Sequence, residues 1–177
     1  VGFDVYDTIR QFDEFKLDSL GLTLRMSHPF ADFWRWLAQY RITRDKISDV
    51  ESSVPTDLIG EQGTRVTSLV AGTLMRDSRD SSVAPTKGGN LSLIGEFAGL
   101  GGDSRFVRTI ASATYFQPIW LDHILSGRVE VGYGVGWDGE ELPLFERFYL
   151  GGPNTLRGFK FRKVSPIDNA GVRVGGD

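Results

Sequence analysis

The segment Arg128-Val129-Glu130-Val131-Gly132-Tyr133-Gly134-Val135-Gly136-Trp137 alternates strictly between two kinds of side chain. One row is apolar and aromatic and consists of Val129, Val131, Tyr133, Val135 and Trp137. The other row has two charged residues followed by glycines, namely Arg128, Glu130, Gly132, Gly134 and Gly136. Side chains of a β-strand point alternately to opposite faces of its sheet, so this period of two predicts a strand with one apolar face. The glycine row predicts that another part of the protein approaches the polar face closely.

Six further segments show alternation, although the fourth is mixed: residues 1–10, 20–27, 34–42, 64–75, 91–97 and 105–116. We expect long polar connections after the first, third and seventh segments, and short turns after the second, fourth and sixth. The connection after the fifth segment is also short and fits this alternation of long and short connections least well. Together these features predict an all-β fold, an antiparallel up-and-down sheet of the kind found in outer-membrane β-barrels.

Composition excludes several other classes of protein. The 177 residues include no cysteine, which excludes disulfides and thiolate metal sites. A formal net charge of -3 argues against a nucleic-acid partner that needs a broad basic surface. No apolar run of roughly 18 residues is present, so a membrane-spanning helix is not expected. The sequence opens directly on an alternating pattern and shows no signal peptide, which predicts a fragment of a larger protein.

The tryptophans favour a transmembrane barrel. Trp34, Trp36 and Trp120 lie near predicted short turns, whereas Trp137 lies toward a long loop. Two bands of aromatic side chains at opposite strand ends are typical of barrels that cross a bilayer, where they mark the two interfaces. A soluble β-sandwich also alternates, and the sequence alone does not decide which face is outside.

The segment Glu146 to Phe159 follows the glycine-bearing strand and reads ERFYLGGPNTLRGF. Gly151, Gly152 and Pro153 mark a loop with unusual backbone angles. The segment closely resembles the inward-folded sixth extracellular loop of the Omp85 superfamily. That resemblance implies that residues Leu156, Arg157, Gly158 and Phe159 fold into the barrel lumen, where Arg157 binds carboxylates on later strands. We expect Gly132, Gly134 and Gly136 to leave room for this loop.

A second segment also resembles the Omp85 barrel. The charged run Arg76, Asp77, Ser78, Arg79 and Asp80, followed by a turn at residues 84–89, is similar to a strand-to-turn segment of the family. Taken alone, the run favours a solvated strand end with compensating charges. The resemblance implies that the seven strands are the fifth to eleventh of sixteen. It also implies a single partial barrel domain over residues 1–177, without POTRA repeats.

No catalytic constellation is visible in the sequence. His28 and His123 lie in separate predicted turns without metal-ligand spacing around them, so we expect solvent-facing histidines and no metal. Glu140, Glu141 and Glu146 are read as a flexible acidic loop, and no Ser/His/Asp set is apparent. We therefore expect neither enzymatic activity nor a cofactor.

The resemblance implies a function in the bacterial outer membrane, where assembly factors of this family fold and insert other β-barrel proteins. Its implied partners are the lipid bilayer, unfolded outer-membrane proteins and accessory lipoproteins, but not nucleic acid. Alternatives within the superfamily are transporters for two-partner secretion or autotransporter assembly. A passive porin is less favoured because a porin does not require the Arg157 loop, and a soluble sandwich is least favoured.

Overall fold

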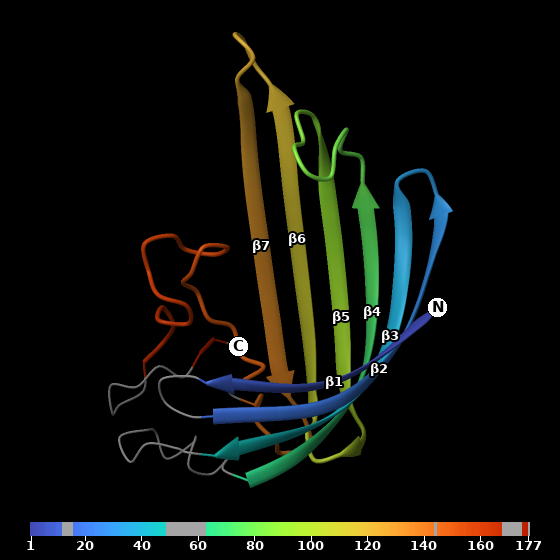
Figure 1. Ribbon diagram of the computed structural model, residues 1–177, viewed down its shortest axis with the longest axis vertical. Helices are drawn as coiled ribbons and strands as arrows, with labels where there is room; N and C mark the ends of the chain where they lie inside the picture. Colours follow the sequence, from blue (N-terminus) through green and yellow to red (C-terminus); the bar gives the residue numbers. More distant parts are fainter. Residues whose placement is uncertain (12–15, 49–62, 144, 168–174, 177) are drawn as a thin grey trace.

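The computed structural model describes residues 1–11, 16–48, 63–143, 145–167 and 175–176. They form seven strands: β1 (Gly2–Gln11), β2 (Lys16–Ala31), β3 (Trp34–Ser48), β4 (Gly63–Asp77), β5 (Gly88–Gly102), β6 (Phe106–Pro118) and β7 (Ile124–Gly136). Each strand pairs antiparallel with the next, which gives one sheet in the order β1 to β7 (Figure 1). The predicted all-β up-and-down architecture is confirmed, and the described residues contain no helix that could cross a membrane.

Several strands are longer than the sequence pattern predicts. The strand β2 continues through His28 to Ala31, so His28 lies opposite Trp36 in a sheet and the prediction of a turn histidine is wrong. The strand β3 continues past Ile42 through three charged residues to Ser48, although the alternating segment was expected to end at residue 42 and a long polar connection to follow it. Hydrogen bonds between backbones hold a ladder together whatever the side chains are, so strands extend beyond their apolar stretches.

The cross-strand register sorts the side chains onto two faces. Phe97 of β5 lies opposite Val107 of β6, and Val107 lies opposite Val135 of β7. The neighbouring positions on these strands, Glu96 and Arg108, point to the other face. We call the apolar face the outer face and the face that carries Glu96 the inner face.

The outer face is uncovered. On strands inside the sheet, the outer-face residues Leu22, Leu93 and Val107 are 36%, 46% and 39% exposed. A sandwich would cover such a row with a second sheet, and the described residues contain only one sheet. In the described residues the apolar face is therefore uncovered, as the lipid-facing side of a membrane barrel is.

The strand connections gather at two ends of the sheet (Figure 1). Short connections at Asp32–Phe33 and Ile119–His123, together with residues 78–87, lie at one end, which we call the turn end. The chain leaves β7 at the opposite end, which we call the loop end, and the residues after Gly136 form no further long strand among those described. This end positions the candidate site.

Candidate functional site

The loop after β7 lies directly on the glycine row of the inner face. A Cβ atom added to Gly132 would come within 2.5 Å of the Phe148 ring, and one added to Gly134 within 2.9 Å of Leu142. At Gly136 the same atom would lie 2.0 Å from the backbone oxygen of Glu140. These separations are shorter than any ordinary contact, so only glycine leaves room for the loop at these positions.

An apolar cluster holds the first part of the loop against the wall. Leu142 is 3% exposed and packs with four buried residues of β4, β5 and β6: Leu69, Ala71, Ala98 and Phe106. This cluster lies on the inner face. Two further buried apolar residues, Leu17 and Ile47, lie opposite each other on β2 and β3 outside this cluster.

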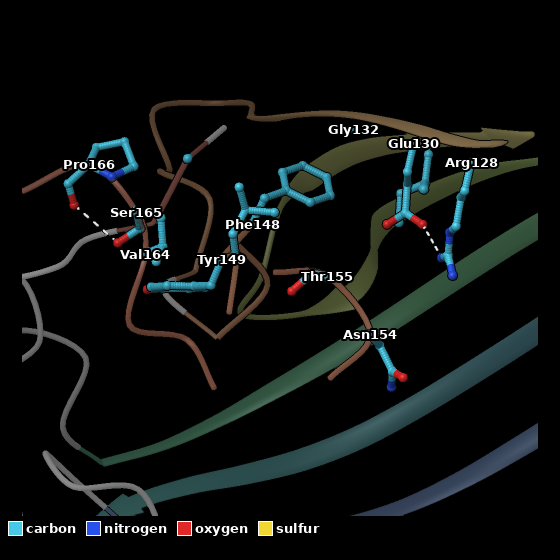
Figure 2. A pocket seen from close by; sticks show the side chains of 13 residues that line it. Arg128, Glu130, Gly132, Phe148, Tyr149, Asn154, Thr155, Val164, Ser165 and Pro166 are labelled. Atoms are coloured by element: carbon cyan, nitrogen blue, oxygen red, sulfur yellow. Dashed lines mark hydrogen bonds and ion pairs between the residues drawn. The ribbon is translucent and has the colours of Figure 1, made fainter. Parts of the chain in front are cut away.

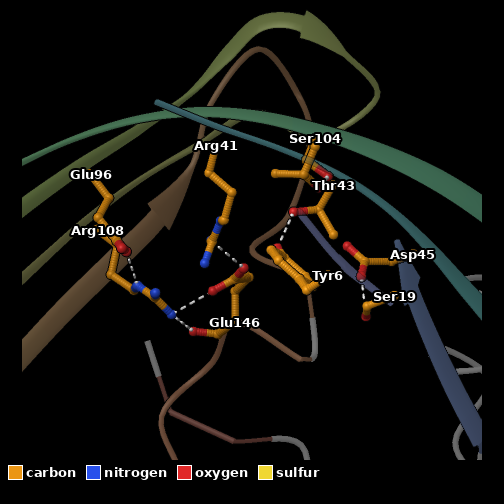
Figure 3. Close-up of polar contacts among 10 residues, drawn as sticks. Tyr6, Ser19, Arg41, Thr43, Asp45, Glu96, Ser104, Arg108 and Glu146 are labelled. Atoms are coloured by element: carbon orange, nitrogen blue, oxygen red, sulfur yellow. Dashed lines mark hydrogen bonds and ion pairs between the residues drawn. The ribbon is translucent and has the colours of Figure 1, made fainter. Parts of the chain in front are cut away.

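An ion-pair network holds the next part of the loop (Figure 3). The Glu146 carboxylate accepts from Arg108 at 2.7 Å and from Arg41 at 3.2 Å, and the Glu146 carbonyl accepts a further bond from Arg108 at 2.8 Å. Arg108 also donates to Glu96 at 2.5 Å. The network thus joins β3, β5 and β6 to the loop.

The charges of this network balance, because two arginines face two glutamates. The side chains of Glu96, Arg108 and Glu146 are only 12%, 15% and 13% exposed. Charges so far removed from water are stable only when paired and hydrogen-bonded. Glu146 is therefore a fixed ion-pair partner, and the expectation that it belongs to a flexible acidic loop is wrong.

The residues that follow Glu146 are held by backbone and arginine contacts. Arg147 donates from Nε to the Leu142 carbonyl at 2.9 Å and pairs with Glu141 at 2.9 Å. Phe148 exchanges two backbone hydrogen bonds with Gly176, of 2.8 and 2.9 Å. These contacts connect this part of the loop to residues 141–142 at its beginning and to Gly176 near the end of the chain.

The segment with the family-like wording forms a compact turn. Gly152 pairs with Leu156 in an isolated bridge and donates its N–H to the Phe159 carbonyl at 2.8 Å. Gly151 has φ 115° and Gly152 has φ 92°, backbone angles that favour glycine. The Thr155 hydroxyl accepts from the Gly151 N–H and donates to the Gly151 carbonyl.

Arg157 lies at the exposed tip of this turn. Across the described ranges of the chain no hydrogen bond or ion pair of its guanidinium is found, and Leu156, Gly158 and Phe159 beside it are exposed as well. Gly158 has φ 91° with open space around it. The binding of Arg157 to carboxylates of later strands stays a prediction.

A cavity of about 740 Å³ separates the loop from the inner face of β6 and β7 (Figure 2). Phe148, Tyr149 and Thr155 line it from the loop, and Arg128 and Glu130 from the wall. The wall charges pair with each other at 2.6 Å. No cluster of three or more metal-ligating side chains occurs in the part of the chain that the structure describes.

The charged motif at residues 76–80 lies partly in the turn after β4 and partly on the outer face of the sheet. Arg79 binds Asp77 through two bonds of 2.8 and 2.7 Å, and Asp80 accepts from the Thr86 N–H at 2.9 Å and the Lys87 N–H at 3.2 Å. Hydrogen bonds from the Thr86 side chain and from these backbone groups lower the pKa of Asp80 to about 2. Arg76 instead points to the outer face, opposite Trp34.

The four tryptophans all lie toward the ends of the strands. Trp34 and Trp36 are part-exposed near the turn end, and Trp120 is 73% exposed in the turn between β6 and β7. Trp137 directly follows β7 at the loop end and stacks on Phe97, with 5.6 Å between ring centroids. Their places agree with two aromatic bands, whose membrane role stays a prediction.

The residues missed from the sequence are the ion-pair partners Arg41, Glu96, Arg108 and Glu146. The alternation does place Glu96 and Arg108 on polar faces of neighbouring strands, which is a usable signal. Pairing them, however, requires the register of β5 on β6, and pairing either with Glu146 requires the path of the loop.

The comparisons with known proteins agree with this geometry. The Omp85 superfamily domain matches residues 1–177, which is the whole chain. The chain belongs to the Omp85 superfamily. Within this Omp85 family, the outer membrane protein assembly factor BamA of Nitratidesulfovibrio vulgaris is 31% identical over 179 residues, which cover 99% of this chain and 23% of that protein.

The chain is also similar to a second relative in sequence and to a crystal structure in fold. A SAM50-like protein of Drosophila melanogaster is 31% identical over 130 residues, covering 73% of this chain and 29% of the relative. The crystal structure of BamA from Haemophilus ducreyi lacking POTRA domains 1–3 superimposes with a TM-score of 0.78, covering 93% of this chain and 34% of that one at 16% identity. The chain thus has the fold of an Omp85 outer-membrane barrel and spans about a quarter of the length of its curated relatives.

Proposed function

We propose that this chain is the central wall of an outer-membrane barrel that folds and inserts other β-barrel proteins. The relatives named as assembly factors support this proposal, since their likeness covers up to 99% of the chain. The proposed partners are the bilayer, unfolded outer-membrane proteins and accessory lipoproteins. The proposed activity is conformational and involves no covalent catalysis.

The attachment of the loop to the inner wall carries the proposal. A passive pore needs an open lumen, whereas here Leu142 is buried against the wall and Glu146 joins Arg41 and Arg108. We propose that the attached loop braces the barrel while its strands pair with substrate strands.

The substitution Glu146→Gln in the full-length protein tests this role. It removes one buried charge, leaves Glu96 as the only carboxylate partner of Arg108 in the network, and takes the carboxylate away from Arg41, a loss on the order of 3 kcal/mol for a broken buried pair. We expect at least a severalfold fall in the rate at which the variant assembles a porin-type substrate in proteoliposomes.

A matched control is Glu141→Gln. Glu141 is a glutamate of the same loop, but its side chain is 81% exposed and pairs only with Arg147 among the contacts found. Exposed pairs contribute at most about 1 kcal/mol, so this variant should assemble substrate at nearly the normal rate. Equal rates for both variants and the unchanged protein would contradict the proposed bracing.

A further inference from the structure

The chain turns from the outer side of the sheet into the lumen within four residues, Trp137 to Glu140. Asp138 and Gly139 have φ 61° and 80°, and the Glu140 N–H donates to the Trp137 carbonyl at 3.3 Å. Positive φ at both central residues is the signature of a type I′ turn, for which Asp-Gly is a favoured pair. This turn brings the backbone of Glu140 and Glu141 over Gly136.

Three contacts with other protein groups orient the side chain of Trp137. Its indole N–H donates to the Ala98 carbonyl at 3.0 Å, and its ring stacks on Phe97 at an interplanar angle of 19°. The Arg105 guanidinium lies 5.8 Å from the ring centroid, a distance typical of a cation–π contact. Arg105 also forms an ion pair with Asp138, the next residue of the turn.

The strand β5 provides a recess for the indole ring. Between Ala98 and Gly102 it bulges, because this four-residue step faces only the two-residue step from Leu69 to Thr67 on β4. A Cβ atom on Gly99, within the bulge, would lie 2.3 Å from the Trp137 ring. Gly99 also has φ 136°, so both the space and the backbone angle favour glycine there.

We propose that Trp137, together with Asp138, is a positioning residue that sets the direction in which the loop enters the lumen. An aromatic residue that only anchors the barrel in the interface would direct its polar atom to water or headgroups. Here the indole N–H donates to a backbone carbonyl of β5, which is two strands away from β7 in the sheet. The inference rests on the proposed function, in which the position of the loop matters for assembly.

The test is Trp137→Phe in the full-length protein, reconstituted in phospholipid vesicles and followed by hydrogen exchange with mass spectrometry. Phenylalanine keeps an aromatic ring and loses the N–H donor. We expect exchange in residues 138–150 to become about fivefold faster, the factor that corresponds to one typical hydrogen bond, with the strands unchanged. The control is Trp120→Phe, an exposed tryptophan at the turn end, which should leave exchange in the loop unchanged.

A second variant, Arg105→Gln, removes the ion pair with Asp138 and keeps Trp137, and it decides the matter if Trp137→Phe fails to insert. It too should accelerate exchange in residues 138–150. Unchanged exchange in both variants, or an equal rise throughout the strands, would overturn the proposal. If loop exchange is faster in these variants but Glu146→Gln assembles substrate normally, this inference is supported and the proposed function is contradicted.

Discussion

Gly136 shows how a single residue can decide where the loop lies. The backbone oxygen of Glu140 lies 2.0 Å from where a Cβ atom of residue 136 would stand, and a backbone atom cannot rotate away as a side chain can. We expect Gly136→Ala to lower the free energy of unfolding by about 1–3 kcal/mol, the usual cost of overpacking. Urea unfolding of the full-length protein in vesicles measures this.

Gly127→Ala is the matched control for that substitution, because Gly127 lies on the same strand with nothing within 4 Å of an added Cβ. Neither glycine has a positive φ, and Gly127 lies on the outer row with Val129, so the control adds the same methyl group to the same strand in open space. An equal loss of stability in both variants would contradict the explanation that contact with the loop requires glycine at residue 136.

The turn between β4 and β5 is organised by Asp80. Because the pKa of Asp80 is lowered to about 2, its carboxylate stabilises the fold fully above the ordinary value of 3.8, and this contribution is lost as the pH falls through about 2. We expect Asp80→Asn to be less stable than the unchanged protein at pH 6 and equally stable near pH 2. Unfolding at the two pH values checks this, with Asp32→Asn in the neighbouring turn as the control.

The two faces of the seven-stranded sheet should differ in how much stability an added charge costs. Val131 lies in the middle of the outer row of β7, so Val131→Arg puts a cation into hydrocarbon and should cost about 2–4 kcal/mol of stability in vesicles. Ser112→Arg places the same cation on the inner face opposite Glu130 and should cost much less. An equal loss for both would contradict the assignment of the outer face to lipid.

Much of the architecture follows from residue patterns that act over short distances. Along β7, Val129 and Val131 point to one face and Glu130 and Gly132 to the other. This alternation is enough to predict a strand with one apolar face. The ends of β2 and β3 were misplaced because His28 to Ala31 and Arg44 to Lys46 lack an apolar row, while the ladder continues through backbone hydrogen bonds.

Residue patterns alone predict the class of fold, the inner position of the glycines and a family-like loop after them. The tertiary structure alone decided which charges meet, because Glu146 lies 105 residues from Arg41 along the chain and 3.2 Å from it in space. The same is true of Trp137, whose partner Ala98 lies on another strand. Alternation is a local property of a strand, whereas contacts between a loop and a wall depend on strand register and curvature, which arise only when all seven strands pair.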